Sequence, residues 1–578
     1  MNKSALRNYI GLANTLHDSA LAIVNSRGAV VFAEATERPM QYKRALNISA
    51  DVIHHTGDLV DTFCEHDAEI VVASSWRAEM EQEWTAQLRS LKVDPHNVAA
   101  RFGTPIEEFA LRSGIRSVAF AGLSVDYELM RVGWPKGIAR EARTYPHHLT
   151  HAATACFTSP FEEAVCAVSD GFGEDSSIAF FFYKNGKLHE LPTPTPKGTE
   201  SLGLFFLEVC GLCGFSLLSG EEWKVMGLAA HGTRDMELET LFHKLIQVDG
   251  LSIVSCSTTE ELAEARRILE SKRRRPGVPV INGANIAHAG QNVFCDLSIK
   301  LLNNLYEVHP HDNLVVSGGC ALNSSCNGKI LESTPFKRLH VFSAPGDDGN
   351  AVGAALLAYY QDNPNSKPAP GFQSPYLGSR MESETLLNVR RFNSTPKIHE
   401  CDNPSRLAAS KLASGQVIGW IQGRAEFGPR ALGNRSILAD PRPVTIKDHI
   451  NSRVKFREEF RPFAPAILHE FGPEYFENYQ ESPYMERTLL FKPSAAKRVP
   501  GVVHEDGTGR LQSVRREWNE QFYSLIYAFY ELTGIPIVLN TSFNVMGKPI
   551  SHSVEDAIAV FYTTGLDALF IDKIVLEK

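Results

Sequence analysis

The chain has 578 residues, of which 43% are hydrophobic and 22% are charged, and its formal net charge is −9. These values are typical of a globular protein with three or four lobes, and they exclude a disordered chain and speak against a nucleic-acid partner. The first residues, MNKSALRNYIGLA, lack the apolar core of a signal peptide, and no run approaches the roughly 18 apolar residues of a membrane span, so we expect a cytoplasmic protein without a membrane partner. Of the ten cysteines only Cys210 and Cys213 form a CxxC pair, which excludes a zinc ribbon and is typical of a reducing compartment.

Two stretches of the chain share one pattern of strands and turns. Residues 9–35 predict strand, polar turn, strand, Ser-Arg-Gly turn and strand, and residues 164–191 predict strand, acidic glycine-rich turn, strand, Asn-Gly turn and strand. Two copies of one meander indicate an internal duplication, although two unrelated hairpins would give the same pattern. A duplicated meander followed by helices is the plan of the actin-like and sugar-kinase-like nucleotide-binding folds. We therefore predict an α/β fold with phosphate-binding turns at residues 14–19 and 170–176.

The first of these turns holds His17 and Asp18. Their side chains would face the cleft between the lobes, where either one is a candidate to deprotonate or orient a substrate hydroxyl. The alternative is that Asp18 only stabilises the turn. Residues 34–44, EATERPMQYKR, mix acids and bases. This composition predicts a solvated loop, or a lid over an anionic ligand.

A histidine pair marks the next helix. Pro146 suits a first helical turn, and Thr144 is a candidate cap before it. His147 and His151 lie four residues apart, so both imidazoles project from one face. Asp170 ends the buried strand that follows, and a carboxylate opposite a helical histidine pair suits a divalent metal. The alternative is a pair of partly exposed histidines without a function.

The middle of the chain offers phosphate-binding candidates. Lys224 lies between glycine turns and could reach a phosphate, although a lysine that extends its charged end to the surface would look the same. Residues 313–330 predict a buried strand, then Gly318 and Gly319, then a helix. Paired glycines before a helix start form a backbone cradle for a phosphate or for adenosine.

A second strand-to-helix turn follows in residues 340–360, which read HVFSAPGDDGNAVGAALLAYY. Asp347 in this turn is available as a fourth metal ligand. Residues 362–378 are rich in proline, asparagine, serine and glycine, and we place a domain boundary there.

Residues 416–467 contain a concentration of cations that alternate with apolar and glycine residues: Arg424, Arg430, Arg435, Arg442, Lys447, Arg453, Lys455, Arg457 and Arg461. Guanidinium groups spaced in this way suit phosphate and carboxylate oxygens. Because the chain as a whole is acidic, this local cluster suits a small anion better than a polynucleotide. Arg510 follows, and the turn at 539–550 adds the hydrogen-bonding groups Thr541, Ser542 and Asn544. A surface ion pair is the alternative for any single arginine.

Together these segments resemble the ATP-dependent O-carbamoyltransferases, a family that includes the nodulation-factor enzyme and antibiotic enzymes acting on aminoglycoside, cephem and ansamycin hydroxyls. The resemblance covers nearly the whole chain and depends on these motifs: HHLTHAA, SDGFGE, WKVMGLAAHG, SGGCALN, PGDDGNAVGAA, QGRAEFGPRALGNRSILADPR, FREEFRPFAP and NTSFNVMGKPI. The segment EATERPMQYKR and His231 depart from the usual family pattern. Both would border the acceptor pocket.

The resemblance implies an architecture. Residues 1–365 would form a duplicated actin-like (ASKHA) domain similar to the tRNA threonylcarbamoyltransferase. Residues 366–394 would be a linker. Residues 395–578 would form an α+β domain similar to the threonylcarbamoyl-adenylate synthase (YrdC-like).

The resemblance also implies site residues and cofactors. The C-terminal domain would bind ATP, with Mg, and carbamoyl phosphate, and would make carbamoyl-adenylate through Lys455, Arg430, Arg435, Arg461, Arg510, Ser542 and Asn544. The N-terminal domain would bind the adenylate near Lys224, Gly318, Gly319 and Asn323. A divalent metal, iron in the best-understood relatives, would be held by His147, His151, Asp170 and Asp347, whereas His148 points elsewhere on the helix. Asp347 fits the family spacing better than Asp348.

The chemistry agrees with this reading, because a mixed anhydride with AMP has a better leaving group than carbamoyl phosphate, and a metal can polarise it. The expected acceptor is a hydroxyl of a small-molecule natural product such as an antibiotic, toxin or glycoside. The alternatives are carbamoylation or threonylcarbamoylation of RNA or protein, and a non-catalytic nucleotide sensor. The sequence leaves open the acceptor, the metal and the oligomeric state, with a homodimer as one option.

Overall fold

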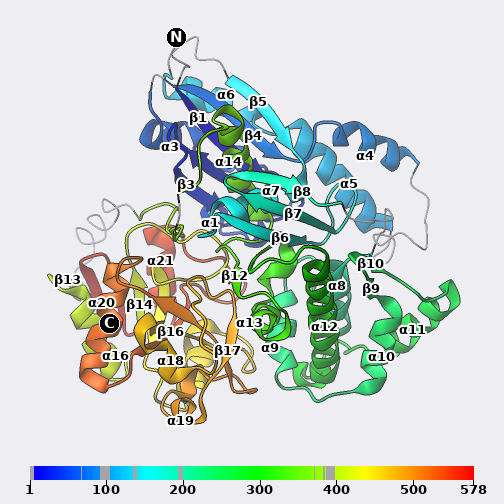
Figure 1. Cartoon of the computed structure of the whole chain (residues 1–578). Coiled ribbons are helices and arrows are strands. Elements are labelled where there is room, and N and C mark those ends of the chain that lie inside the picture. Colours follow the sequence, from blue (N-terminus) through cyan, green and yellow to red (C-terminus); the bar gives the residue numbers. More distant parts are fainter. Residues whose placement is uncertain are drawn as a thin grey trace.

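The computed structural model describes residues 6–66, 68–90, 104–134, 140–192, 200–369, 371–381, 385 and 397–578. These residues form two lobes built on separate five-stranded sheets, followed by a C-terminal domain. Figure 1 shows the first lobe (blue) above the second lobe (green), with the C-terminal domain (yellow to red) beside the second lobe. Within the predicted linker at 366–394, residues 370, 382–384 and 386–394 lie outside the described residues.

The two lobes contain the same sheet. The first has the order β3-β2-β1-β4-β5 and the second the order β12-β11-β6-β7-β8. In each, the first three strands form an antiparallel meander and two later strands add in parallel. The bounds in the first lobe are β1 (Arg7–Ala13), β2 (Ala20–Val24), β3 (Val30–Ala35), β4 (Glu69–Ser75) and β5 (Arg140–Tyr145). Those in the second are β6 (Glu163–Ser169), β7 (Ile178–Lys184), β8 (Lys187–Glu190), β11 (Asn313–Ser317) and β12 (Arg338–His340).

This repeated topology confirms the predicted duplication and the actin-like α/β class, so the alternative of two unrelated hairpins is wrong. The strand expected in residues 340–360 is shorter than the sequence suggested, since β12 ends at His340.

Two helices pack together between the sheets, each against the other lobe. α7 (His147–Phe157) leaves the first sheet and packs on β6 and β11, and α14 (Asn350–Asp362) leaves the second and packs on β1, β2 and β4. Small residues permit this contact. A Cβ on Gly11 would lie 1.8 Å from the carbonyl oxygen of Ala351, and one on Gly353 would lie 2.0 Å from that of Thr150. His147 begins α7 and Asp347 lies just before α14, so the packing brings both of them into the cleft between the lobes.

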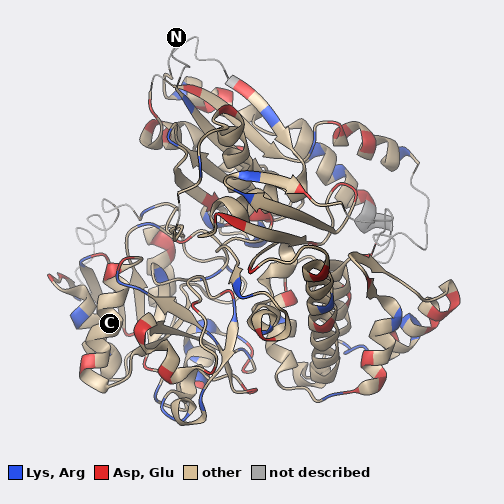
Figure 2. Ribbon diagram, viewed as in Figure 1, with Lys and Arg blue, Asp and Glu red and all other residues tan. Residues whose placement is uncertain are grey.

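The remaining helices of the first lobe are α1 (Glu37–Met40), α2 (Ala50–Ile53), α3 (Thr56–Phe63), α4 (Met80–Arg89), α5 (Thr104–Ala119) and α6 (Leu123–Arg131). Those of the second are α8 (Leu202–Leu212), α9 (Glu222–Ala229), α10 (Met236–Leu245), α11 (Thr259–Lys272), α12 (Ala284–Val308) and α13 (Ser324–Ser333). No described helix is long and apolar enough to cross a bilayer. Figure 2 shows acidic and basic positions interspersed over all three parts.

The C-terminal domain is built on an eight-stranded mixed sheet of order β13-β22-β21-β14-β15-β20-β16-β19, which confirms the α+β class. Its strands are β13 (Lys397–Glu400), β14 (Ile418–Ile421), β15 (Arg435–Ala439), β16 (Ala464–Leu468), β19 (Gln512–Val514), β20 (Ile537–Ser542), β21 (Ala568–Ile571) and β22 (Ile574–Glu577). Its helices include α16 (Pro404–Ala413), α17 (Ile446–Ile450), α20 (Glu520–Thr533) and α21 (Val554–Thr563).

Two local predictions were wrong. Residues 34–44 are not a solvated loop, because Glu34 and Arg38 are each only 3% exposed and Arg38 donates to the carbonyl of Gly428, 2.8 Å away, in the C-terminal domain. The alternative, a lid over an anionic ligand, stays a prediction. Thr144 does not cap α7, because it lies within β5. The Glu174 carboxylate accepts from the His147 amide instead, at 2.9 Å.

A buried ion pair joins the first lobe to the C-terminal domain. Glu34 lies 3.6 Å from Nδ1 of His552 and accepts hydrogen bonds from the amide and hydroxyl of Ser379 at 2.9 and 3.0 Å. Burial opposes the charge on both groups, yet their mutual attraction lowers the pKa of Glu34 to about 2 and raises the pKa of His552. His54 and Arg38 lie nearby, and burial lowers the pKa of His54 to about 4.

We expect Glu34→Gln to lower the unfolding temperature by about 3 °C or more. The Glu34 contribution is lost as pH falls from its ordinary pKa of 4.5 toward 2, and the His552 contribution is lost as pH rises above 6.5. The difference from wild type should therefore be largest between these two values, as measured by thermal unfolding across pH. The exposed Glu79→Gln is the control, and a difference that does not vary with pH would contradict the ion pair.

Candidate metal centre and anion site

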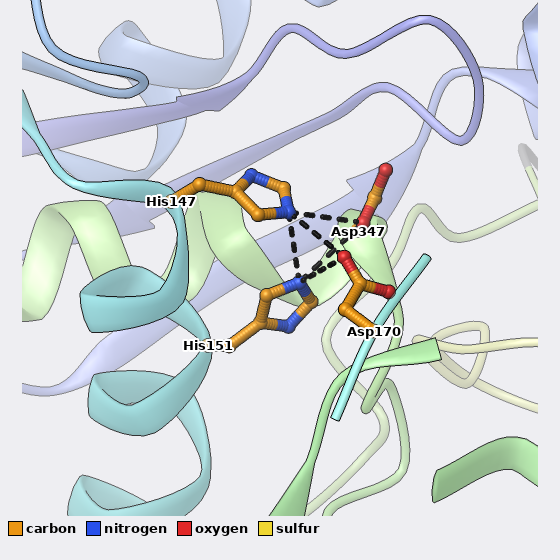
Figure 3. Close-up of side chains that lie close together, drawn as sticks. All are labelled: His147, His151, Asp170 and Asp347. Atoms are coloured by element: carbon orange, nitrogen blue, oxygen red, sulfur yellow. Dashed lines mark hydrogen bonds and ion pairs between the residues drawn. The ribbon is translucent and has the colours of Figure 1, made fainter. Parts of the chain in front are cut away.

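Four side chains converge in the cleft between the lobes (Figure 3). His147 and His151 project from the first two turns of α7, Asp170 follows β6, and Asp347 precedes α14. One ligand atom from each of the four lies within 4.8 Å of the others, and Asp348 is not a member of the group. His148 points away and packs against Gly173.

The spacing of these atoms fits a bound cation. The two Nε2 atoms are 3.2 Å apart, and each lies 3.1–3.6 Å from one oxygen of Asp170 and of Asp347. Ligands at about 2.1 Å from a tetrahedral ion would be roughly 3.4 Å apart. Two imidazoles and two carboxylates thus fit a divalent transition metal.

The charges of the cluster favour a cation. Burial alone would lower the pKa of His151, but Asp170 and Asp347 raise it to about 10. The pKa of Asp170 is lowered well below its ordinary value, because the two histidines outweigh the effect of burial. The amide of Gly319 donates to the other oxygen of Asp170 at 2.9 Å and fixes the carboxylate.

Trp76 and Asn350 hold His147 from the sides. The Trp76 indole stacks on the imidazole with centroids 4.1 Å apart and planes 12° apart, and its Nε1 donates to the carbonyl of Asn14 at 3.1 Å. Trp76 has φ of +80°, a left-handed conformation that costs a bulky residue about 1–3 kcal/mol. The Asn350 amide lies 3.4 Å from Nδ1 of His147 and 3.2 Å from Nε2 of His151.

We expect Trp76→Ala to weaken metal binding by about 10–100-fold, because partners of a ligand orient it for the metal. Trp76→Phe keeps an aromatic ring and should lose less affinity. Calorimetric titration of the metal-free protein measures the effect, and Trp134→Ala is the control for loss of an indole elsewhere in the first lobe. Unchanged affinity in Trp76→Ala would show that the stacking has no part in metal binding.

Charged side chains of the turn after β1 contact the candidate metal ligands. Nδ1 of His17 lies 2.9 Å from Asp18 and 3.6 Å from Asp347, and Asp18 pairs with Arg44 at 3.1 Å. Burial and Arg44 oppose a proton on His17, but Asp18 and Asp347 raise its pKa. The structure thus places the predicted pair beside the metal cluster, where it can hold a proton.

The predicted anion-binding residues of the C-terminal domain gather at a second point. Lys455 ends a π-helical turn (Asn451–Lys455), is 2% exposed, and its Nζ donates to the carbonyls of Ser542 and Asn544 at 2.7 and 2.9 Å. It also contacts both of these side chains. Burial and the nearby cations Arg457, Arg461 and Lys43 lower its pKa well below the usual value.

The arginines around Lys455 share this cationic environment. Burial is the main cause that lowers the pKa of Arg430, Arg457, Arg461 and Arg510, and each of the first three is further lowered by a neighbouring arginine. Nε of Arg461 and Nε of Arg510 have no hydrogen-bond partner. Glu458 contacts Arg461 at 3.4 Å. A multiply charged anion would relieve this repulsion.

One cavity of about 1320 Å³ joins the two points. Its lining includes His17, Asp18, Asp170 and Asp347 on one side and Arg430, Lys455, Arg461, Arg510, Ser542 and Asn544 on the other. Gly319, Asn323 and Lys224 also line it.

Several predicted residues have other roles in this structure. Arg435 is fully buried and does not line the cavity; it donates to carbonyls of Gln422, Asn434, Gly423 and Ser379 at 2.9–3.1 Å. The structure therefore does not bring it together with the other arginines. Gly318 is required where β11 approaches β6, because a Cβ there would lie 2.2 Å from the carbonyl oxygen of Ser169.

The second-lobe candidates that line the cavity are already paired. Lys224 pairs with Glu221 at 2.7 Å and with Glu458 at 2.9 Å. Asn323 caps α13 and exchanges hydrogen bonds with Gln291.

Sequence reasoning missed three cavity residues. Arg457 was one arginine among many, and only its burial beside Arg461 distinguishes it. The ring centroid of Trp223 lies 3.8 Å from the guanidinium carbon of Arg461, and although Trp223 begins the WKVMGLAAHG motif, the sequence suggested no role for it. Trp76 follows β4 directly, and an aromatic residue at a strand end was the only available signal.

Two protein-family models match this chain. Residues 8–356 match the family described as "Carbamoyltransferase N-terminus" and residues 409–578 match "Carbamoyltransferase C-terminus". Nodulation protein NolNO of Sinorhizobium fredii is 37% identical over 440 residues, which are 75% of this chain and 63% of that protein. Nodulation protein NolO of Bradyrhizobium diazoefficiens is 36% identical over 444 residues, 75% of this chain and 78% of that protein.

Among solved structures, component A of the Acidaminococcus fermentans (R)-2-hydroxyglutaryl-CoA dehydratase is similar over 62% of this chain and 99% of its own, with 13% identity and a TM-score of 0.34. The two family matches span both lobes and most of the C-terminal domain. The chain belongs to the carbamoyltransferase family.

Proposed function

We propose that this protein is an ATP-dependent O-carbamoyltransferase. Residues 395–578 activate carbamoyl phosphate with ATP to form carbamoyl-adenylate. Residues 1–365 transfer the carbamoyl group to a hydroxyl of a small-molecule natural product. The family membership supports carbamoyl transfer, and the ATP-dependent route is our extension of it.

One observation carries the proposal: a buried group of cations and the four candidate metal ligands open into the same cavity. These buried cations repel one another, so a bound anion with several negative charges would stabilise them. A nucleoside triphosphate together with carbamoyl phosphate provides such charge. The shared cavity allows an anhydride made at the cations to reach the metal without leaving the protein.

The first step joins the carbamoyl group to AMP. Transfer of the phosphoryl group of carbamoyl phosphate to water leaves inorganic phosphate and carbamate. A carbamate oxygen then attacks the α-phosphorus of ATP, and pyrophosphate leaves with the electrons of the broken P–O bond. The charge that develops on the phosphates would be stabilised by Lys455, Arg430, Arg461 and Arg510. Ser542 and Asn544 would hold the Lys455 side chain in place. Mg would accompany the triphosphate.

The second step transfers the carbamoyl group. The acceptor oxygen attacks the carbamoyl carbon, the bond from this carbon to the AMP oxygen breaks, and the hydroxyl proton passes to His17 or Asp18. Gly319, Asn323 and Lys224, which line the cavity, would border the adenylate. A metal held by His147, His151, Asp170 and Asp347 would supply Lewis-acid polarisation. We propose iron from the family resemblance, while this ligand set also suits zinc and manganese.

The test is an incubation with ATP, Mg and carbamoyl phosphate but no acceptor, followed by mass spectrometry. We expect pyrophosphate together with carbamoyl-adenylate or its breakdown product AMP. Omission of carbamoyl phosphate is the control. ATP that stays intact in the complete mixture would contradict the proposed first step.

A further inference from the structure

The part of the cavity nearest the metal cluster is lined by apolar groups from both lobes. On the first lobe, Trp76 stacks on His147, and Trp84 of α4 meets Trp76 edge to face with centroids 5.2 Å apart. The Trp84 ring packs over Gly114 of α5, where a Cβ would lie 2.7 Å from it, and Leu111 lines the cavity one turn earlier.

The second lobe supplies the facing wall. Phe172 lies two residues after Asp170 and is 40% exposed. Gly203, at the start of α8, is packed so closely that a Cβ would lie 3.0 Å from the carbonyl oxygen of Asp170. Leu204 and Leu207 follow on α8, and both line the cavity. Apolar surface therefore begins at the metal ligands on both sides.

The two walls meet across the cleft. Arg77, next to Trp76, pairs with Asp175 of the turn that holds Phe172, at 3.3 Å.

Charge is scarce along these two walls of the cavity. Among the described cavity residues numbered 76–114, none is charged, and among those numbered 171–218 only Glu174 is. The Glu174 carboxylate is already the acceptor for the amide of His147. Between these two walls a charged ligand group would lose its hydration without gaining a partner, and a polyol would leave hydroxyls unpaired. The charged side chains His17, Asp18 and Arg44 lie instead beside Asp347, outside the two walls. An apolar ring would instead cover exposed carbon surface.

We propose that the acceptor presents its hydroxyl to the metal from an uncharged apolar ring system, aromatic or alicyclic, which lies between α4–α5 and α8. This inference rests on the proposed function and narrows it to one substrate class. In this arrangement the basic region of the cavity binds the carbamoyl-adenylate, and the apolar walls bind the acceptor alcohol.

Three probe alcohols of similar size test the proposal with the metal-loaded protein, ATP, Mg and carbamoyl phosphate. They are 4-methylbenzyl alcohol, 4-(aminomethyl)benzyl alcohol, which adds one positive charge to the same ring, and methyl glucoside, which has a polar ring. Carbamoylated product is followed by mass spectrometry and binding by ligand-observed NMR. We expect at least tenfold higher kcat/KM and tighter binding for 4-methylbenzyl alcohol than for the other two.

Leu207→Asp places a charge in the wall and should remove most of this preference, whereas Leu532→Asp, at an exposed leucine outside the cavity, should keep it. Equal use of the three alcohols, preference for the charged or polar one, or no binding preference would overturn the proposal. Pyrophosphate release without acceptor is measured in parallel. Its presence together with the wrong acceptor preference would refute the substrate class alone, and its absence would refute the proposed function.

Discussion

Replacement of Lys455 by methionine is expected to lower pyrophosphate release from ATP and carbamoyl phosphate by about 10²–10³-fold. Methionine retains the apolar stem but cannot donate the hydrogen bonds that Lys455 gives to Ser542 and Asn544. The site also loses the buried positive charge at the point where phosphate charge develops. Initial rates of pyrophosphate release, with both substrates saturating, measure the effect.

Lys497→Met, at an exposed lysine of the same domain that does not line the cavity, is the matched control and should retain its rate. Metal content is the second control, because Lys455→Met should bind as much metal as wild type. A near-normal rate in a folded Lys455→Met protein would remove this lysine from the activation step.

For His151→Ala we expect the reverse result, in which carbamoyl transfer is lost and pyrophosphate release is retained. His151 is fully enclosed and contributes one of the four ligand atoms. Each of the other three described members of the group already contributes one atom, so none of them can replace it. We expect metal content to fall from about one ion per chain to near zero, and carbamoyl transfer to any acceptor to fall at least 10²-fold. Pyrophosphate release without acceptor should continue, because the cations around Lys455 are unchanged.

His148→Ala is the control for this variant, since His148 is also a buried residue of α7 but lies outside the group of candidate metal ligands. Elemental analysis and product formation are measured on the same samples. Retention of stoichiometric metal by His151→Ala would contradict the proposed ligand set, and loss of pyrophosphate release would contradict the division into two sites.

Much of the fold followed from local patterns. The two meanders were visible because strand alternation and turn residues such as Asn185-Gly186 are decided by neighbours in the chain, and both residues of that turn have positive φ. The histidine pair on one face of α7 followed from helical spacing.

Other features depended on distant partners. Residues 34–44 look like a solvated loop by composition, yet the C-terminal domain buries Glu34 and Arg38. Arg435 resembles the other arginines in sequence, but carbonyl groups of four residues surround it, and this arrangement exists only in the folded domain. Thr144 suited a helix cap by its position in the sequence, but in the structure the carboxylate of Glu174, from another segment, accepts from the His147 amide.

Local periodicity and motifs that are contiguous in the chain were enough to predict the duplicated α/β plan, the candidate residues for a metal and an anion, and the family. Only the tertiary structure decided that the two sites share one cavity, that Trp76 holds His147, and that apolar walls flank the metal cluster. These properties arise from contacts between segments that lie far apart in the chain. No local pattern encodes such distances.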